Sequence, residues 1–176
     1  MKKLLLFLVP VLLMAAACDT TPTPKDYVFQ DIAFTYPSNW KVDNEDKQED
    51  RVTLYLVKDD NTFIYIDLQK WEEELFEDMG DEDIVDAIAS DAYGIFELDK
   101  DDEEMDIQDL DILQDGTEGD GFLVEYSGTN MGDPFTSRIL CKMVDTYEVL
   151  VRTETMEEAN KAEINEILNS FRLVKE

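Results

Sequence analysis

Two runs of β-branched and aromatic residues lie close together in this chain, and they restrict it to folds that contain an antiparallel sheet. In "RVTLYLVKDDNTFIYIDLQK" the runs cover residues 51 to 57 and 62 to 70. Residues of these types favour strands because they pack well on a pleated surface. Between the runs, Asp59-Asp60-Asn61 supplies side chains that favour a tight turn. The segment therefore predicts a β-hairpin.

Further strands are predicted on both sides of this hairpin. Residues 27 to 30 and 32 to 36 are two short aromatic-rich runs that meet near Gln30-Asp31. Four more runs follow the acidic segment 99 to 104, and the turn sequence "NMGDP" separates the second from the third. These four runs are "MDIQDLDILQ", "DGFLVEYSGT", "PFTSRILCKMV" and "YEVLVRTET".

Two helices are predicted between and after these strands. The first covers about 82 to 97, where apolar residues at helical spacing share one face: Ile84, Ile88, Ala92, Ile95 and Phe96. The second opens at the capping-box sequence "TMEE", which starts at Thr155, and runs to about Phe171. Its apolar stripe consists of Ile164, Ile167, Leu168 and Phe171. The order of strands, helix, strands and helix predicts an α+β fold, a single antiparallel β-sheet flanked by helices.

Two short stretches of the chain resemble the PsbP-like superfamily. One is "IAFTYPSNW" at 32 to 40, and the other is the closing segment "INEILNSFRLVKE". The matching residues are Phe34, Tyr36, Pro37 and Trp40 in the first stretch, and Ser170 and Phe171 in the second. We expect these to be packing residues, with Pro37 ending a strand and Trp40 closing one end of the core.

The resemblance implies a domain of about 27 to 176 with an antiparallel sheet and flanking helices. Relatives in this superfamily include an accessory subunit of photosystem II, a Ran-binding nuclear import factor and many bacterial lipoproteins. The resemblance therefore implies binding or assembly without catalysis, although function does not follow from fold alone.

The first seventeen residues read as a cleaved export signal. Lys2 and Lys3 precede an apolar run from Leu4 to Met14, which spans only about half of a hydrocarbon core and suits a signal peptide better than a membrane span. Ala15-Ala16-Ala17-Cys18 resembles the bacterial lipobox. The resemblance implies that Cys18 is the lipidation site, carries diacylglyceryl or palmitate groups, and begins the mature protein. An ordinary secretory signal that happens to end in cysteine is the alternative.

This signal predicts a protein held by lipid at the cell membrane or cell envelope, on the extracytoplasmic side. Residues 18 to 26 would then form the lipidated N-terminus and a flexible linker, because "DTTPTPKD" is rich in proline and threonine. The net charge of −28 argues against nucleic acid as a partner, since phosphate binding needs clustered Lys and Arg. It also argues against a domain that rests flat on anionic lipid.

Cysteine and histidine content exclude several kinds of chemistry. The chain has two cysteines and no histidine, so Ser-His-Asp triads, Cys-His pairs and His-ligated zinc are all excluded. With Cys18 lipidated, Cys141 has no partner within the chain for a disulfide. Cys141 alternates with apolar residues along "PFTSRILCKMV", so we expect it in the core beside Phe135, Ile139 and Met143.

The acidic runs "EEELFEDMGDEDIVD" and "DKDDEEMD" are the remaining candidates for chemistry. Oxygen-rich clusters suit calcium. However, neither run has EF-hand spacing, and "DLDILQDG" lacks the third ligand. We therefore assign no metal ligand, no catalytic residue and no cofactor-binding residue.

Three functions remain open. The leading one is a membrane-anchored, non-catalytic lipoprotein with a binding or accessory role and an unidentified envelope protein partner. The second is an acidic surface domain that binds a divalent cation such as calcium. The third is an enzyme, which would need a carboxylate pair or a metal, and no spacing in the sequence indicates either.

Overall fold

The computed structural model describes residues 22–72, 74, 79–116 and 121–174. Its elements, in chain order, are β1 (Pro24–Phe29), β2 (Ile32–Pro37), β3 (Lys41–Lys47), β4 (Arg51–Asp59), β5 (Thr62–Lys70), α2 (Asp81–Lys100), β6 (Met105–Asp115), β7 (Phe122–Asn130), β8 (Asp133–Val144), β9 (Tyr147–Thr155), a 3-10 turn (Glu158–Asn160), α3 (Lys161–Leu168) and β10 (Arg172–Leu173). The predicted signal 1–17 and Cys18 lie outside the described residues. Among the helices described, none is long and apolar enough to cross a membrane.

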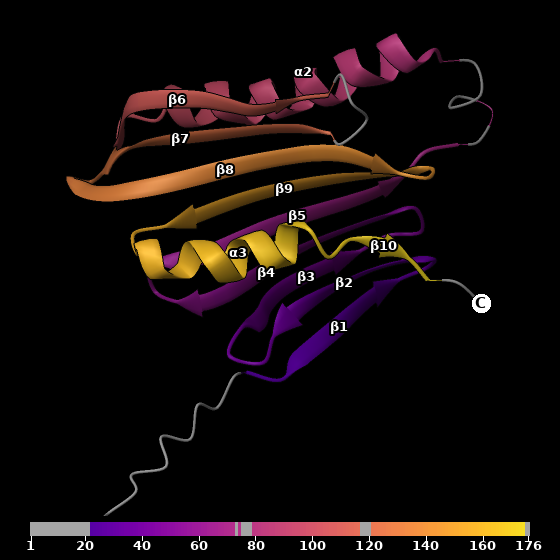
Figure 1. Ribbon diagram of the computed structural model, residues 1–176, viewed down its shortest axis with the longest axis horizontal. Helices are drawn as coiled ribbons and strands as arrows, with labels where there is room; N and C mark the ends of the chain where they lie inside the picture. The colour runs from indigo at the N-terminus through magenta and orange to yellow at the C-terminus, as the bar shows by residue number, and fades with distance from the viewer. Residues whose placement is uncertain (1–21, 73, 75–78, 117–120, 175–176) are drawn as a thin grey trace, which may run out of the picture.

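Seven strands form one large antiparallel sheet in the order β3-β4-β5-β9-β8-β7-β6 (Figure 1). The predicted hairpin is confirmed as β4 and β5, and the backbone N–H of Asn61 donates to Oδ1 of Asp59 at 2.9 Å in its turn. The predicted turn after β7 is confirmed as well. Met131 and Gly132 both have positive φ, 52° and 93°, as a two-residue hairpin turn of the type I′ class requires.

The prediction of a single sheet is wrong, because β1 and β2 do not join the large sheet. They form a second sheet of three strands with β10, in the order β1-β2-β10. Pro37 ends β2, and a turn in which the N–H of Trp40 donates to the carbonyl of Pro37 at 3.0 Å redirects the chain into β3. The small sheet thus packs against the large one instead of extending it. Strand β1 also begins at Pro24, inside the segment expected to be linker.

Strand β3 is an element that the sequence does not predict. Its residues, "KVDNEDK", show no run of strand-forming residues, and all of them are exposed. It forms because β4 offers an edge for pairing, and it ends the large sheet on that side. Because the side chains of β3 are exposed, side-chain burial contributes little to this strand, and backbone pairing with β4 accounts for it.

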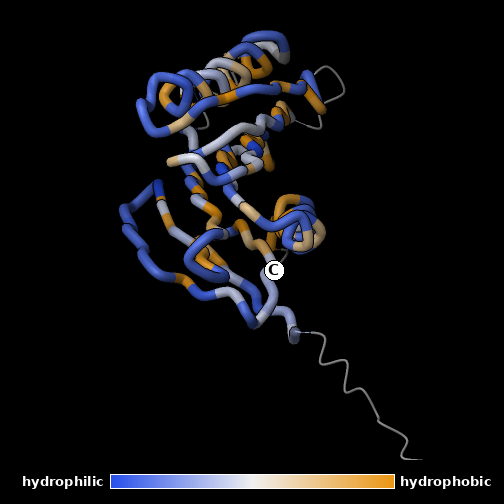
Figure 2. The backbone as a smooth tube through the Cα atoms, turned by 90° about the vertical axis from the view of Figure 1, so that its left-hand side faces the viewer, coloured by the Kyte–Doolittle hydropathy of each residue, from blue (hydrophilic) through white to orange (hydrophobic). Residues whose placement is uncertain are grey.

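Two apolar cores lie on opposite faces of the large sheet. The first, here called the α3-side core, gathers side chains of β2, β4, β5, β9 and α3 under the small sheet. The second, the α2-side core, joins α2 to β7 and β8 through Ile88, Ala92, Phe96, Phe122, Val124, Tyr126, Phe135, Ile139 and Cys141. Figure 2 shows hydrophobic and hydrophilic residues alternating along the strands, which is typical of strands with one face buried in a core and a more polar opposite face.

The C-terminal helix is shorter than predicted. Thr155 belongs to β9, and its hydroxyl accepts the N–H of Glu157 at 3.1 Å within a turn, so the predicted capping box does not form. A 3-10 turn intervenes before α3 begins at Lys161. Phe171 lies beyond the helix end and packs against Phe34 of the small sheet, with ring centroids 5.0 Å apart. The predicted apolar stripe is nonetheless buried in full.

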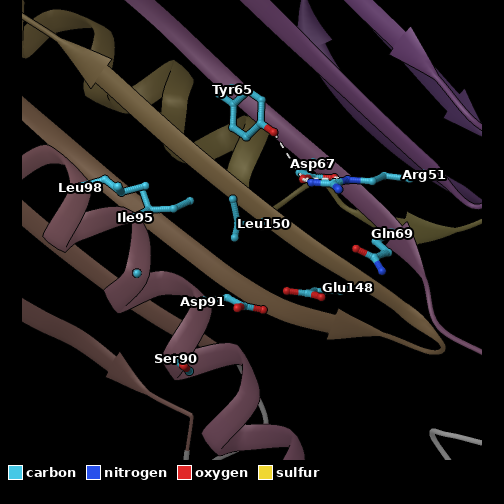
Figure 3. Close-up of a pocket in the computed structure, with 11 residues that line it drawn as sticks. Arg51, Tyr65, Asp67, Gln69, Ser90, Asp91, Ile95, Leu98, Glu148 and Leu150 are labelled. Atoms are coloured by element: carbon cyan, nitrogen blue, oxygen red, sulfur yellow. Dashed lines mark hydrogen bonds and ion pairs between the residues drawn. The ribbon is translucent and has the colours of Figure 1, made fainter.

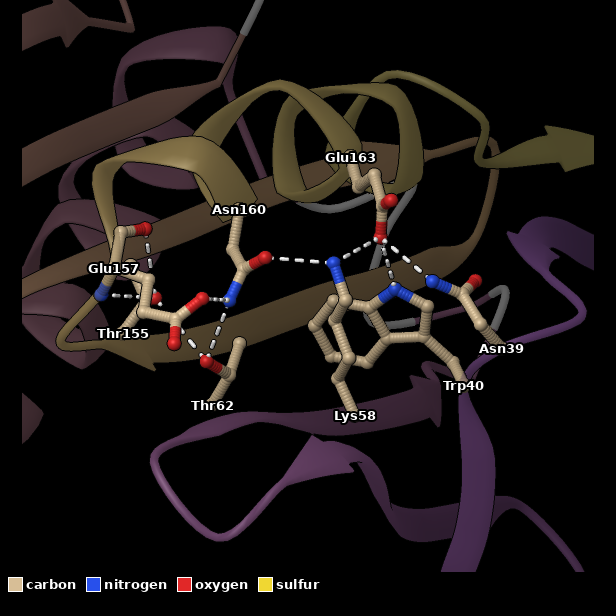
Figure 4. A network of polar contacts seen from close by, with 8 residues as sticks. All are labelled: Asn39, Trp40, Lys58, Thr62, Thr155, Glu157, Asn160 and Glu163. Atoms are coloured by element: carbon tan, nitrogen blue, oxygen red, sulfur yellow. Dashed lines mark hydrogen bonds and ion pairs between the residues drawn. The ribbon is translucent and has the colours of Figure 1, made fainter. Parts of the chain in front are cut away.

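Trp40 is fully buried, as the sequence predicts, and a polar network joins it to α3 (Figure 4). Its Nε1 donates to Oε2 of Glu163 at 2.8 Å. Lys58 Nζ donates to the same carboxylate oxygen at 2.9 Å and to Oδ1 of Asn160 at 2.6 Å. Burial by itself would raise the pKa of Glu163, but Lys58 and Trp40 outweigh it and lower that pKa. The network therefore fixes α3 on the sheet by charge-assisted hydrogen bonds.

Replacement of Trp40 tests this account of the core. We expect Trp40→Ala to lower the free energy of unfolding by about 3 to 5 kcal/mol, because it leaves a large cavity. Trp40→Phe keeps most of the packing and loses the hydrogen bond, so it should cost clearly less, as Glu163 still has Lys58. Urea unfolding followed by circular dichroism measures both. A loss within about 0.5 kcal/mol for the alanine variant would contradict the packing role.

Candidate functional site

A cleft of about 570 Å³ lies between α2 and the large sheet (Figure 3). It exists because α2 packs against β6, β7 and β8 and leaves the same face of β4 and β5 uncovered. The cleft is lined by Arg51, Tyr65, Asp67, Gln69, Ser90, Asp91, Gly94, Ile95, Leu98, Glu148 and Leu150.

The strand register places the sheet residues of the cleft on one face. Asp67 of β5 is directly opposite Leu150 of β9, and Gln69 is opposite Glu148. Residues that are directly opposite in an antiparallel pair point to the same side of the sheet. The cleft thus combines residues of β4, β5, β9 and α2 that are far apart in the sequence.

An ion pair forms one wall of the cleft. Arg51 donates from Nε to both carboxylate oxygens of Asp67, at 2.9 and 3.2 Å, and its terminal nitrogen also binds that carboxylate. The hydroxyl of Tyr65 donates to Oδ2 of Asp67 at 3.3 Å. The carboxylate raises the pKa of Arg51, chiefly through these hydrogen bonds. The guanidinium is therefore held by its own chain and does not offer a simple site for an anionic ligand.

Two carboxyl groups face each other on the floor of the cleft (Figure 3). Glu148 of β9 is only 8 % exposed, whereas Asp91 of α2 is exposed. Glu148 Oε2 accepts the indole N–H of Trp71 at 3.0 Å, and Oε1 accepts the thiol of Cys141 at 3.4 Å. Burial raises the pKa of Glu148, and a hydrogen bond with Asp91 raises it further. The carboxyl of Glu148 therefore stays protonated to a higher pH than that of an ordinary glutamate.

Half-exposed aromatic side chains continue from the cleft over the uncovered face. Tyr55 lies against Tyr65 and Phe63, with ring centroids 5.1 and 6.4 Å apart. The guanidinium of Arg152 lies 5.5 Å from the ring centre of Phe63. We call this the aromatic patch: Tyr55, Phe63 and Tyr65. At its border, Leu98 of α2 is 73 % exposed.

Asp99 has a structural contact that its place in an acidic run does not suggest. Its Oδ2 accepts from Nε of Arg152 at 2.8 Å, and it also accepts the hydroxyl proton of buried Tyr126. Burial by itself would lower the pKa of Arg152, but Asp99 outweighs it and raises that pKa. The contact fixes the last turn of α2 to β7 and β9. In the part of the chain that the structure describes, no three Asp, Glu or Cys side chains gather closely enough to hold a metal ion.

Of the residues singled out in the sequence, Cys18 lies outside the described residues, and Cys141 does not line the cleft but contacts it through Glu148. Cys141 is buried beside Phe135, Ile139 and Met143 in the α2-side core, as predicted, and burial raises the pKa of its thiol. The pair of Asp91 and Glu148 is not predicted from the sequence. Glu148 is the one acidic residue of β9 before Glu154. A carboxyl within this strand-forming run is the sequence feature that could have indicated a functional residue. Its partner lies on a helix, so no spacing in the sequence could reveal the pair.

Replacement of Glu148 tests whether the pKa of its carboxyl is raised in the folded chain. The pKa of Glu148 is raised above its ordinary value of 4.5 in the folded chain, so ionisation opposes folding as the pH rises from about 4.5 through the higher folded pKa. We expect Glu148→Gln, which keeps an oxygen acceptor for Trp71, to raise the melting temperature at pH 7.5. The difference from the unaltered chain should shrink towards pH 4.

Thermal unfolding by circular dichroism from pH 4 to pH 8 measures this effect. The exposed control Glu166→Gln should change the melting temperature little at either pH. If Glu148→Gln were destabilising by the same amount at both pH values, the glutamate would be an ionised packing residue instead.

Comparisons with known proteins identify the fold. No protein-family sequence model and no curated protein sequence matches this chain. Among solved structures, the cyanobacterial PsbP (CyanoP) of Synechocystis is 12% identical with a TM-score of 0.50, and the match covers 92% of this chain and 98% of that one.

The Ran-binding protein Mog1p of Saccharomyces cerevisiae is 15% identical with a TM-score of 0.51, over 88% of this chain and 97% of that one. A protein from Bacteroides thetaiotaomicron is 14% identical with a TM-score of 0.48 over 86% of this chain, which spans only 49% of that longer protein. The two full-length matches agree with the resemblance found in the sequence, and this chain has the PsbP-like fold.

Proposed function

We propose that this protein is a non-catalytic bacterial lipoprotein whose PsbP-like domain binds a protein partner at the cell envelope. The domain would have an accessory role in an assembly on the extracytoplasmic side of the membrane. The observation that carries the binding role is the cleft under α2 with its adjoining aromatic patch. Apolar side chains left open on a folded domain, next to arginine and tyrosine, have the composition of protein interfaces.

The anchor is the part of the proposal that rests on the sequence. Cys18 follows three alanines at the end of an apolar run. Because β1 begins at Pro24, five residues lie between Cys18 and the first strand, and the six Cα–Cα steps from Cys18 to Pro24 can span at most about 20 Å. A lipid at Cys18 would therefore keep the domain close to the membrane surface.

The fold supports one orientation for the tethered domain. In Figure 1, β1, the first described strand, lies at one side of the molecule, and α2 and β6 lie at the opposite side. The described segment 79–116, which forms α2 and β6, is strongly acidic and contains Lys100 as its one basic residue. Anionic lipid repels carboxylates. The tether and the charge thus both favour α2 and β6 pointing away from the membrane.

The chemistry of the cleft supports binding over catalysis. The Arg51 guanidinium is neutralised by Asp67. The carboxyl of Glu148 is held in place by hydrogen bonds from the indole of Trp71 and the thiol of Cys141. Ile95, Leu98 and Leu150 supply an apolar wall. Such a surface suits an amphipathic segment of another protein, with aliphatic groups against the wall and a cationic group near Asp91.

Replacement of Cys18 tests the anchor. In cells that express the full chain, Cys18→Ala should abolish labelling by radioactive palmitate and leave the chain uncleaved or release it from the membrane fraction. Cys141→Ala removes the other cysteine and should keep both the label and the membrane location. Equal labelling of the Cys18→Ala chain and the unaltered chain would refute the lipid anchor.

Site-specific photo-crosslinking in intact cells tests the binding role. A photoreactive amino acid at Leu98, at the border of the cleft, should yield an adduct of defined mass with an envelope protein. The same amino acid at exposed Glu166 of α3 should not, and Tyr55→Ala should weaken the adduct at Leu98 because it removes part of the aromatic patch. No adduct at Leu98, or the same adduct from both positions, would count against this surface.

A further inference from the structure

We propose that the edge strand β6 accepts an extended segment of a partner protein as an additional strand, and that this segment alternates apolar and basic side chains. This surface is separate from the cleft under α2. The inference goes beyond the proposed function, because it names a second contact and the chemistry of the chain that would fill it.

The position of β6 makes strand addition possible. It ends the large sheet, and among the described residues its only strand partner is β7. Its eleven residues, Met105–Asp115, make it one of the longer strands of the sheet. The outer side of an edge strand presents backbone N–H and C=O groups that another extended chain can pair with.

The register with β7 gives the two faces of β6 different chemistry. Leu110 is opposite Tyr126 and Ile112 is opposite Val124, and both partners belong to the α2-side core. Leu110 and Ile112 therefore point to the α2 side of the sheet. Asp111, opposite Glu125, points to the other side. By the same register Asp109, opposite Ser127, also points there.

The apolar face of β6 lacks the cover that the same face of β7 has. Tyr126 and Val124 are buried, whereas Leu110 is 42 % exposed and Ile112 is 52 % exposed. Side chains at an edge stay exposed when no strand follows to flank them. A further strand with apolar side chains on this face would bury Leu110 and Ile112 between itself and β7.

The acidic face decides which partner fits. Asp109 and Asp111 lie in a segment, 79–116, that contains fifteen Asp and Glu residues and one lysine. A second copy of this chain would bring the same carboxylates face to face, and like charges across neighbouring strands are destabilising. A strand with Lys or Arg at alternate positions would instead form cross-strand ion pairs. Charge therefore selects a basic segment and disfavours self-association.

Irregularities limit the length of the pairing. The register of β6 shifts between Ile107 and Asp109 and again between Ile112 and Gln114. Bulges of this kind interrupt an edge and restrict indiscriminate pairing. The regular stretch from Asp109 to Ile112 lies between them. A short segment of the partner is thus sufficient, and it would be centred on this stretch.

Peptide binding to the full chain in detergent micelles tests the proposal. The probe is a fluorescent eight-residue peptide that alternates lysine and valine. Its competitors are a peptide with the same residues in two blocks and an alternating peptide with every second backbone nitrogen methylated. We expect the alternating peptide alone to bind, with fluorescence anisotropy as the readout, and the amides of β6 to gain protection from hydrogen exchange.

Charge reversal at the edge supplies the matched variants. Asp109→Lys/Asp111→Lys should weaken binding by about tenfold or more, because it places like charges across from the peptide. Asp43→Lys/Asp46→Lys makes the same change on β3, the opposite edge of the sheet, and should leave the affinity unchanged. Circular dichroism confirms that both variants fold.

Three outcomes would overturn the proposal. Equal binding of the block or methylated peptide would show non-specific attraction by charge. Hydrogen-exchange protection outside β6 would place the peptide elsewhere, and a dimer in sedimentation equilibrium that protects β6 would identify a second copy as the occupant. Since none of these readouts involves Leu98 or Tyr55, the result is independent of the cleft.

Discussion

The large sheet has two faces to cover, and the rest of the structure depends on how unequally they are covered. On one face, the small sheet and α3 bury the apolar side chains of β4, β5 and β9. On the other face, among the described residues, α2 is the helix that covers β7 and β8, and it stops short of β4 and β5. One helix about 10 Å wide cannot cover seven strands spaced at about 4.8 Å. The cleft and the aromatic patch form because α2 leaves this face of β4 and β5 uncovered.

Arginine contacts show how so acidic a chain holds its parts together. Each of its four arginines pairs with a carboxylate: Arg51 with Asp67, Arg138 with Glu125, Arg152 with Asp99 and Arg172 with Asp26. The contact of Arg152 fixes the end of α2, and that of Arg172 joins β10 to the small sheet. These pairs neutralise carboxylates where elements meet, whereas segment 79–116, which forms α2 and β6, carries fifteen acidic residues and one lysine. That end of the molecule therefore has a strong negative field, which favours basic partners.

The two proposed surfaces use different physical means of recognition. The cleft offers a concave wall and the Glu148 carboxyl, whose pKa is raised by burial, so it would select by shape and by hydrogen bonding. The edge of β6 offers backbone groups and alternating side chains, so it would select by extended conformation and charge. With Cys18 as the anchor, both surfaces would face away from the membrane, where a partner of the envelope could reach them.

The sequence determined those features that depend on neighbouring residues. The hairpin of β4 and β5, the turn at Met131–Gly132, the apolar face of α2 and the burial of Trp40 and Cys141 all followed from local composition and spacing. The resemblance to the PsbP-like superfamily also followed from local sequence, because the motif around Pro37 contains the residues that form the turn after β2.

Tertiary structure alone decided the features that depend on residues far apart in the chain. The separation of β1 and β2 into a second sheet required β10, more than 130 residues away, and β3 formed only because β4 offered an edge. Asp91 and Glu148 became a pair because α2 packs on β8, the neighbour of β9 in the sheet. Asp99 is largely buried because it binds Arg152 and Tyr126. Local patterns encode the propensity and burial of each segment, whereas the packing of whole elements decides which side chains meet.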